Sequence, residues 1–408
     1  MIKKASILAL VAYLLLAILS PGLVQAGSGL TILDSSAQVE FPSALSFNLS
    51  TESDVNITDI SLHYTVDQVT LAQVTSEVYV EFVPANTVDA KWTWDMRKTG
   101  GLPPGSSVDY WWTVEDANGD RLETAPFRVQ FDDTRYSWES LTDGKVNIYW
   151  YEGDESFAQE LVAAAHQALA RLAEDTGAHL KEPVKIYIYA SAQDLKGAMV
   201  YPQEWTGGVA FTRHGIIAIG IAPGNLYWGK RAIAHELTHL VIHQMTINPY
   251  SDLPTWLDEG LAMYAEGELE PAFESYLNKA MAEDNLISVR SLSSPFSAYA
   301  EESRLSYAQS YSLVEFLVSN YQPGKMLELL NSFRQGASYD GALSMSYGFD
   351  MDGLDARWRD YVTAQYKSTE VTVAVIPPPL IGVLAALATA LFLVLALAAE
   401  NWTRRRGW

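Results

Sequence analysis

The first third of the chain contains short segments in which apolar and polar side chains alternate. Ile57–Val66 has this period of two, which is typical of a β-strand with one buried face. Segments of similar character follow at Glu77–Phe82, Trp92–Trp94, Asp109–Val114 and Phe127–Phe131. This many short strands in about a hundred residues predicts a β-sandwich domain over residues 28–133.

Asn118-Gly119 lies between two of these segments and predicts a type I′ hairpin turn. The rhythm of the strands resembles immunoglobulin-like and fibronectin-like domains. We expect the aromatic residues of the strands to fill the core, because isolated aromatic side chains on strands usually pack. A ligand-binding face lined by some of them is the alternative.

The pattern changes after Asp132–Arg135, where we place a domain boundary. A helical period runs from Phe157 to Asp175, and Gly177 follows as a helix stop. Four short strands are expected around this helix, the last two as a hairpin: Val146–Tyr151, Val184–Tyr189, Gly207–Phe211 and Ile216–Ile219. They predict a mixed sheet.

Helices dominate the predicted structure after this sheet. Arg231–His243 contains no Gly or Pro and reads as a buried helix. From Pro254 to Tyr366 the chain is expected to be mostly helical. Residues 136–366 therefore form one predicted domain, and the whole chain is predicted to be a multidomain α+β protein.

The first 26 residues have the features of a secretory signal peptide. Lys3 and Lys4 precede an apolar run from Ile7 to Leu19, and Val24-Gln25-Ala26 is a small-residue cleavage pattern. The run is short for a membrane span, so an uncleaved anchor helix is the less favoured alternative.

The last part of the chain predicts a membrane anchor. Residues 380–399 form an uncharged run long enough to cross a bilayer, and Arg404–Arg406 in the basic tail of residues 400–408 favour the cytoplasmic side. Residues 367–379 end in prolines and are expected to form a stiff, extended stalk. The body of the protein should then lie outside the cell membrane, held by a single span. A sorting tail that is cut and replaced by a covalent anchor is the alternative.

The composition limits the possible functions. Of 408 residues, 49% are hydrophobic, which is enough for a sizeable core. The net charge of -22 argues against nucleic acid as a partner. The absence of cysteine excludes disulfide bonds, thiolate metal sites and a cysteine nucleophile.

The segment from His235 to His239 reads His-Glu-Leu-Thr-His and is the most informative motif. Residues four apart lie on one face of a helix, so His235 and His239 can direct two imidazoles at one point. A zinc ion needs such convergence, and Glu236 can reach a water molecule there. Two zinc ligands and a general base on one helix are typical of metalloproteases. A chance match, with histidines packed in the core, is the alternative.

A third zinc ligand is expected on the next predicted helix. Glu259 lies among apolar residues such as Trp256 and Leu261, where an acid is costly unless it is paired or binds a metal. Nineteen residues separate His239 from Glu259, which leaves room for a turn between two helices.

These two stretches resemble the gluzincin metallopeptidases, and most closely the peptidase MA-like family. The resemblance rests on His-Glu-x-x-His followed by Trp-Leu-x-Glu-Gly-x-Ala, and it covers roughly the second predicted domain. It implies one zinc ion bound by His235, His239 and Glu259. It also implies that Glu236 is the general base.

The aminopeptidase branch of this group typically has eighteen residues in the interval between the second histidine and the acid, which would place Asp258 at the ligand position. We assign Glu259 because Glu-Gly is the motif, and we expect Asp258 to cap the helix or to orient a ligand. His243 lies about 12 Å along the helix from His235 and cannot share one ion with both histidines. It is expected to be structural or to orient a ligand.

Tyr307 and Tyr311 are the first and last residues of a Tyr-Ala-Gln-Ser-Tyr segment before an apolar helix. In related peptidases a tyrosine or histidine donates a hydrogen bond to the developing oxyanion, and either tyrosine could do this here. Ordinary packing is the alternative, since buried tyrosines usually find a structural partner.

The sequence therefore predicts a membrane-anchored zinc peptidase that hydrolyses a peptide or protein substrate. The hairpin strand Gly207–Phe211 could bind substrate backbone as an added strand. It lacks the Gly-x-Met-Glu-Asn motif with which the aminopeptidase branch binds a free amino terminus, so endopeptidase activity and a specialised substrate both remain open. The alternative is a surface binding or adhesion protein that works through its β-domain, with the peptidase fold as a scaffold.

Overall fold

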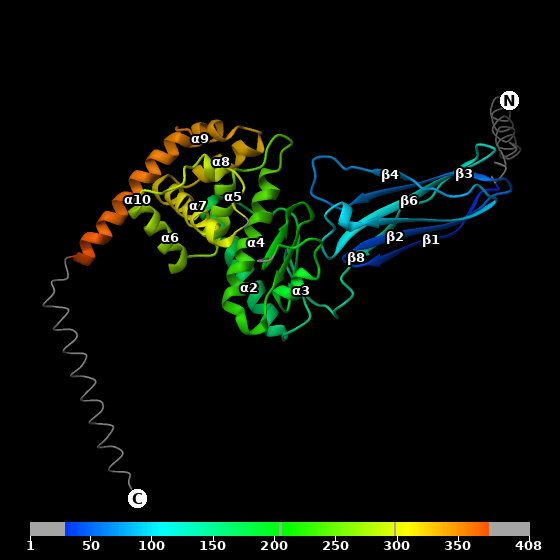
Figure 1. Cartoon of the computed structure of the whole chain (residues 1–408), viewed down its shortest axis with the longest axis horizontal. Helices are drawn as coiled ribbons and strands as arrows, with labels where there is room; N and C mark the ends of the chain where they lie inside the picture. Colours follow the sequence, from blue (N-terminus) through cyan, green and yellow to red (C-terminus); the bar gives the residue numbers. More distant parts are fainter. Residues whose placement is uncertain (1–28, 204–205, 298, 375–408) are drawn as a thin grey trace, which may run out of the picture. The chain divides into compact units, whose positions relative to one another are not determined.

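The computed structural model describes residues 29–203, 206–297 and 299–374 (Figure 1). The signal peptide predicted for residues 1–26 and the membrane span and tail predicted for residues 380–408 lie outside the described residues. Within the described ranges, no helix combines the length and the apolar character needed to cross a membrane.

The chain divides into two compact units. The first contains residues up to Asp154 and residues 184–224, and the second contains residues 155–183 and those from Asn225 onward. The domain boundary predicted near Arg135 falls inside the first unit, because the strands after this point cluster with the strands before it.

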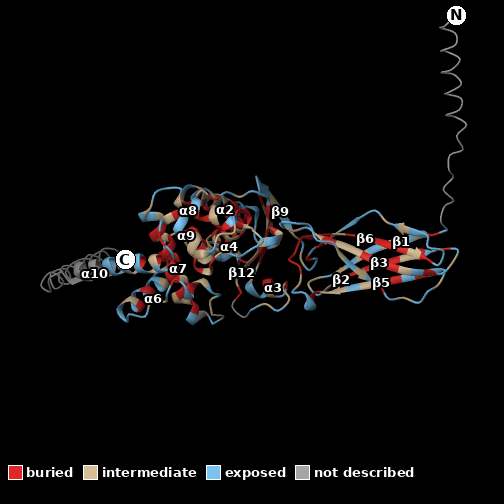
Figure 2. Ribbon diagram, turned by 90° about the horizontal axis from the view of Figure 1, so that it is seen from above, coloured by how far each residue is buried: buried red, intermediate tan, exposed pale blue. Residues whose placement is uncertain are grey.

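The first unit contains the predicted β-sandwich. One sheet has the strand order β1-β2-β5 and the other has the order β4-β3-β6-β7, with β8 also paired to β6. All of these pairs are antiparallel. The strands have these bounds: β1 (Thr31–Glu40), β2 (Ala44–Glu52), β3 (Ile57–Val66), β4 (Ser76–Tyr79), β5 (Thr87–Asp95), β6 (Ser106–Asp116), β7 (Arg121–Glu123) and β8 (Phe127–Phe131). Figure 2 shows buried residues on the strands of both sheets. Their side chains form one core, in which Phe47, Leu62 and Trp112 have no exposed surface.

Two features of the sandwich differ from the sequence predictions. The alternation did not indicate β1, because its side chains are exposed or half-buried and none is fully buried. The turn at Asn118-Gly119 is not type I′, because that turn needs positive φ at both residues and only Gly119 has it, at 81°. The Asp116 carboxylate shapes the turn instead, and accepts the backbone N–H groups of Asn118 and Asp120.

The first unit also contains the predicted mixed sheet, with the order β12-β13-β11-β10-β9. Its strands have these bounds: β9 (Glu139–Asp143), β10 (Val146–Trp150), β11 (Val184–Tyr189), β12 (Gly208–Phe211) and β13 (Ile216–Gly220). Strands β10, β11 and β13 are parallel neighbours, whereas β9 and β12 are antiparallel to the strands beside them. The short helix α3 (Ala192–Lys196) follows β11. Strand β12 therefore has one free edge within this sheet, on the side away from β13.

The second unit is helical. Its helices have these bounds: α2 (Glu155–Thr176), α4 (Leu226–Thr246), α5 (Thr255–Ala265), α6 (Pro271–Ala282), α7 (Ala300–Asn320), α8 (Lys325–Arg334), α9 (Tyr339–Tyr347) and α10 (Met351–Ala374). Their apolar faces share one core, with Trp256 and Trp358 among its largest side chains. The predicted α+β class is confirmed by this strand-rich first unit and helical second unit.

Helix α10 differs from the prediction at its end. It continues through residues 367–374, where the sequence indicated an extended stalk. No Pro or Gly lies between Gly353, in the first turn of α10, and Pro377, so nothing in the sequence stops the helix earlier. Residues 375–379 of the predicted stalk lie outside the described residues.

Candidate metal centre

Helix α4 carries the two histidines of the His-Glu-Leu-Thr-His motif. Its buried side chains, including Val241, Ile242 and Met245, anchor one face in the helical core. His235 and His239 lie one turn apart on the same helix, with ring centroids 4.9 Å apart and ring planes at 76°. Their side chains are 18% and 13% exposed, so both imidazoles are largely buried.

Helix α5 brings a carboxylate to these imidazoles. Its first residue is Thr255, and Pro254, where the sequence predicted the helical region to begin, is the N-cap. The Oε2 atom of Glu259 lies 3.5 Å from Nε2 of His235 and 3.8 Å from Nε2 of His239. One ligand atom from each of the three residues can be chosen so that all lie within 4.8 Å of one another.

This arrangement fits a zinc ion. Nitrogen and oxygen ligands about 2.0–2.1 Å from a tetrahedral zinc ion lie roughly 3.4 Å apart, close to the observed separations. The Oε2 atom of Glu259 is buried and makes no hydrogen bond with the described part of the chain. A buried carboxylate oxygen of this kind needs a partner, and a metal ion would provide one.

A second carboxylate on α5 contacts the other nitrogen of His239. The Oδ1 atom of Asp258 lies 3.2 Å from Nδ1 of His239, so this carboxylate does not join the three-ligand cluster. Burial opposes the charged form of Asp258, but His239 and its neighbours outweigh this effect and lower the pKa of the carboxyl. The structure thus places Glu259 near the Nε2 atoms of both imidazoles and Asp258 on the Nδ1 side of His239.

Glu266 contacts Nδ1 of His235 as Asp258 contacts Nδ1 of His239. It was not identified from the sequence. Its Oε1 atom lies 2.8 Å from Nδ1 of His235, and its Oε2 atom lies 2.9 Å from Nη2 of Arg231. Glu266 follows Glu259 by seven residues, which is two helical turns, so both carboxylates project from one side of α5. That spacing is a signal with which the sequence could have indicated Glu266.

The carboxylates around His235 and His239 make this cluster favourable for a cation. Burial opposes a positive charge on His235, but Glu259, Glu266 and Glu236 outweigh it and hold the pKa of this imidazole well above its usual value. Burial also opposes a charge on His239, yet Asp258 and Glu259 raise the pKa of this imidazole to about 9. The local field therefore stabilises positive charge beside the imidazoles.

Tyr307 on α7 lies near the same carboxylates. Burial raises the pKa of its hydroxyl, and the charges of Glu259 and Glu236 raise it further. Its ring packs edge-on against Phe296, with centroids 5.2 Å apart. Tyr311, one turn further along α7, instead has its hydroxyl 3.5 Å from Oε1 of Glu315. Of the two predicted tyrosines, only Tyr307 interacts electrostatically with the cluster.

The structure shows why a glycine, Gly260, follows Glu259. A Cβ atom on this residue would lie 2.4 Å from the carbonyl oxygen of Ser310 and 2.7 Å from Cγ2 of Val314, both on α7. The glycine therefore lets the backbones of α5 and α7 approach closely. This contact fixes the helix that carries Glu259 against the helix that carries Tyr307.

His243 is half-buried on α4 and is not part of the three-residue cluster. Its charge contributes to lowering the pKa of Asp258, so it lies near that carboxylate. The prediction that it is structural or orients a ligand stays a prediction.

Comparison with known proteins identifies a family for the region that contains this site. Residues 164–364 match the family model of the peptidase MA superfamily. No curated protein matches the chain. The matched region includes α4, α5 and α7 in full.

Solved structures show only distant likeness. OgpA from Akkermansia muciniphila is 10% identical, with a TM-score of 0.20, over 25% of this chain and 27% of that chain. Aminopeptidase A from Legionella pneumophila in complex with aspartic acid is 10% identical, with a TM-score of 0.36, over 81% of this chain and 50% of that chain. A two-domain M1 zinc metallopeptidase bound to L-arginine is 11% identical, with a TM-score of 0.38, over 81% of this chain and 94% of that chain. None of these likenesses reaches a TM-score of 0.5, so the assignment rests on the family model.

Proposed function

We propose that this chain, whose residues 164–364 belong to the peptidase MA superfamily, is a zinc-dependent peptidase. His235, His239 and Glu259 would hold one zinc ion. The observation that carries this proposal is the convergence of the three ligand atoms around a buried Glu259 oxygen that has no hydrogen-bond partner in the described chain. A zinc ion in this position supplies a Lewis acid that polarises a scissile carbonyl and lowers the pKa of a water molecule.

Glu236 is the proposed general base. It is half-buried beside His235 on α4, and its charge reaches both His235 and Tyr307. Its carboxylate would accept a proton from the attacking water and pass it to the leaving nitrogen. Proton transfer by a positioned side chain typically contributes about 10²–10⁴-fold to a rate.

Tyr307 is the proposed donor to the oxyanion. Its pKa is raised, so the hydroxyl keeps its proton at neutral pH and can donate a hydrogen bond. A donor aimed at the developing negative charge stabilises the transition state more than the substrate. Tyr311 is not proposed for this role, because its hydroxyl lies beside Glu315.

Glu266 and Asp258 position the imidazoles. Each carboxylate contacts the Nδ1 atom of one histidine, while the Nε2 atoms of both histidines lie nearest to Glu259. A carboxylate at Nδ1 accepts the ring N–H, so Nε2 is the atom of each ring that a metal ion would bind in place of a proton. These two acids therefore hold both rings in the orientation that a metal would require.

The substrate is proposed to be a peptide or protein outside the cell membrane, reached by a chain with a cleaved leader and a C-terminal membrane anchor. The free edge of β12 supports the prediction that this strand adds to a peptide backbone. Gly208–Phe211 carries no acid that could bind a free amino terminus, which favours an endopeptidase or a specialised substrate.

Metal content and hydrolysis together test the proposed function. The purified chain should contain one equivalent of zinc at neutral pH and should cleave a quenched fluorescent peptide library. Removal of zinc by a chelator should abolish cleavage, and added zinc should restore it. Absence of stoichiometric zinc at neutral pH would overturn the proposal and leave the surface binding protein as the better description.

A further inference from the structure

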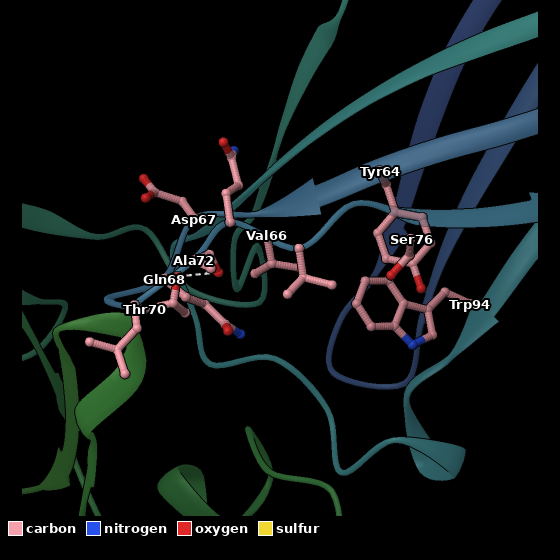
Figure 3. Close-up of a pocket in the computed structure, with 11 residues that line it drawn as sticks. Tyr64, Val66, Asp67, Gln68, Thr70, Ala72, Ser76 and Trp94 are labelled. Atoms are coloured by element: carbon pink, nitrogen blue, oxygen red, sulfur yellow. Dashed lines mark hydrogen bonds between the residues drawn. The ribbon is translucent and has the colours of Figure 1, made fainter. Parts of the chain in front are cut away.

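The β-sandwich contains a cavity of about 530 Å³ beside residues 67–75, the loop that joins β3 to β4 (Figure 3). Small-molecule sites have volumes of about 300–1,000 Å³, so this cavity is large enough for a ligand. The residues that line it lie between Tyr64 and Trp94, far along the chain from the metal centre, and they belong to the first unit. The cavity is therefore a separate candidate site.

One wall of the cavity is aromatic. The rings of Tyr64 and Trp94 meet at 41° with centroids 4.9 Å apart, and Tyr64 also stacks on Trp92 at 5.8 Å. The indole N–H of Trp94 donates to Oγ1 of Thr99 at 3.0 Å, so this ring offers its apolar face to the cavity and not its donor. Tyr64 and Trp94 are only half-buried. Two partly open rings at an angle form a platform for a flat apolar surface.

The rest of the lining combines four aliphatic side chains, those of Val66, Leu71, Ala72 and Val74, with polar groups that are mostly neutral. Gln73 and Ser76 supply an amide and a hydroxyl, Asp67 supplies a carboxylate, and neither Lys nor Arg is among the described residues that line the cavity. In Figure 3, Ser76 lies beside the rings of Tyr64 and Trp94, and Asp67 lies across the cavity from them. The lack of a cation disfavours phosphate, sulfate and carboxylate ligands.

The loop that forms the opposite wall is anchored. The backbone N–H of Val69 donates to the carbonyl of Arg213 at 2.6 Å, and the side-chain amide of Gln68 lies 2.9 Å from Nε2 of His214. Burial lowers the pKa of His214 to about 4, so its ring is neutral near pH 7 and can accept from the amide. The hydroxyl of Thr70 donates to the carbonyl of Ala72 within the loop, at 3.0 Å. The wall is thus formed before a ligand arrives, which reduces the ordering that binding requires.

We propose that this cavity binds a neutral saccharide. A sugar ring has a face of C–H groups and a rim of hydroxyls, which matches aromatic rings on one side and amide, hydroxyl and carboxylate groups around them. Its apolar face would lie on Tyr64 and Trp94, and its hydroxyls would hydrogen-bond to Gln73, Ser76 and Asp67. This property goes beyond the proposed peptidase activity and does not depend on it.

The main rival ligand is a quaternary ammonium group, because paired aromatic rings also attract cations. The neutral groups that line the cavity favour the saccharide. Gln73 and Ser76 would find no hydrogen-bonding partner on a quaternary ammonium ion, whereas a sugar hydroxyl can donate to and accept from both.

Binding to the full chain tests this proposal directly. The chain would carry Glu236→Gln to prevent self-digestion, and would be titrated by calorimetry with cellobiose, maltose, lactose, gentiobiose and choline. Saturation-transfer NMR would show whether the C–H groups of a bound sugar lie against aromatic protons. We expect at least one disaccharide to bind and choline not to bind.

Variants then assign the binding to the cavity. Trp94→Ala should weaken binding about tenfold or more, because truncation of a central aromatic anchor commonly has this effect. Gln73→Ala, on the exposed loop, should weaken binding without any cost to folding. Trp111→Ala is the matched control, since Trp111 stacks on His63 and does not line the cavity. Its affinity should equal that of the parent chain.

Three outcomes would overturn the proposal. These are the absence of binding to all four disaccharides, preferential binding of choline, and equal losses of affinity in the Trp94 and Trp111 variants. If Trp94→Ala does not fold, the Gln73→Ala titration and the NMR contacts of the parent chain still decide. Zinc content and hydrolysis do not enter this test, so its failure would leave the proposed peptidase function intact.

Discussion

The Nδ1 atom of His235 lies 2.8 Å from Oε1 of Glu266, and the other oxygen of this carboxylate lies 2.9 Å from Nη2 of Arg231. Arg231 and His235 are one turn apart on α4, whereas Glu266 lies at the end of α5. One carboxylate therefore ties two residues of the first helix to the second. It also fixes the orientation of the imidazole that presents Nε2 to Glu259.

Glu266→Gln should weaken zinc binding about 10- to 100-fold, as loss of a carboxylate behind a ligating histidine typically does. A fluorescent chelator in competition with the protein would measure this affinity. Glu268→Gln is the control, because the Glu268 side chain is exposed and only its backbone carbonyl contacts Arg231. Equal affinity in the two variants would show that Glu266 does not position His235.

Glu259→Ala should lose zinc at neutral pH, because it removes one of the three converging ligand atoms. Asp258→Asn should keep zinc with an affinity lowered by about 10- to 100-fold, since it changes only the group behind His239. Metal analysis after dialysis distinguishes the two variants. If Glu259→Ala kept zinc and the Asp258 variant lost it, Asp258 would be the third ligand.

Glu236→Gln should keep zinc and lower the rate of peptide hydrolysis by about 10²–10⁴-fold, which is the range for loss of a general base. The amide has nearly the shape of the acid but cannot accept the proton. Glu274→Gln, on an exposed position of α6, is the matched control and should hydrolyse peptides at the parental rate. An unchanged rate in Glu236→Gln would exclude this residue as the base.

Tyr307→Phe should lower kcat about 10²–10³-fold with little change in KM, because an oxyanion donor acts on the transition state. Tyr311→Phe removes the hydroxyl of the other tyrosine, one turn further along α7. It should leave kcat within a few fold of the parent value. Steady-state kinetics on one peptide would compare the pair. A larger loss for Tyr311→Phe would reverse the assignment.

Acid should destabilise the first unit through His214. Its pKa is about 4 in the folded chain against 6.5 for an ordinary histidine, so between these values the unfolded chain binds the extra proton. The free energy of unfolding should therefore fall as pH decreases from 6.5 to 4, by at most about 3 kcal/mol. His214→Gln keeps an acceptor for Gln68 but does not titrate.

Urea unfolding at pH 7 and pH 5 would check this effect. The parent chain should lose more stability between these pH values than the glutamine variant does. Other titrating groups are common to both chains and cancel in the comparison. Identical pH dependence in the two chains would rule out a contribution from His214.

The parts of the site that lie within one helix could be predicted from the sequence. His235 and His239 are four residues apart on one helix, so their convergence follows from helical periodicity alone. Glu259 was accessible because an acid before glycine in an apolar stretch needs a partner. Its distinction from Asp258 depends on the rotation of α5 relative to α4, which local periodicity does not determine.

The parts of the fold and site that depend on contacts between distant segments could not be predicted from the sequence. The spacing from Glu259 places Glu266 on the same side of α5, but Glu266 acquires its role only because α5 packs against α4. Tyr307 and Tyr311 are also four residues apart, so periodicity places both on one side of α7 and does not separate them. Strand β1 forms through pairing with β2, and its side chains show little burial that could mark it in advance.

The close approach at Gly260 fixes the spacing of α5 and α7 independently of the segment that connects them. Because the backbones of α5 and α7 touch there, the spacing between Glu259 and Tyr307 is set by two helices in direct contact. Helix α6 and the loop after it connect these helices but do not set that spacing. An insertion or deletion around α6 should therefore leave the spacing between Glu259 and Tyr307 unchanged.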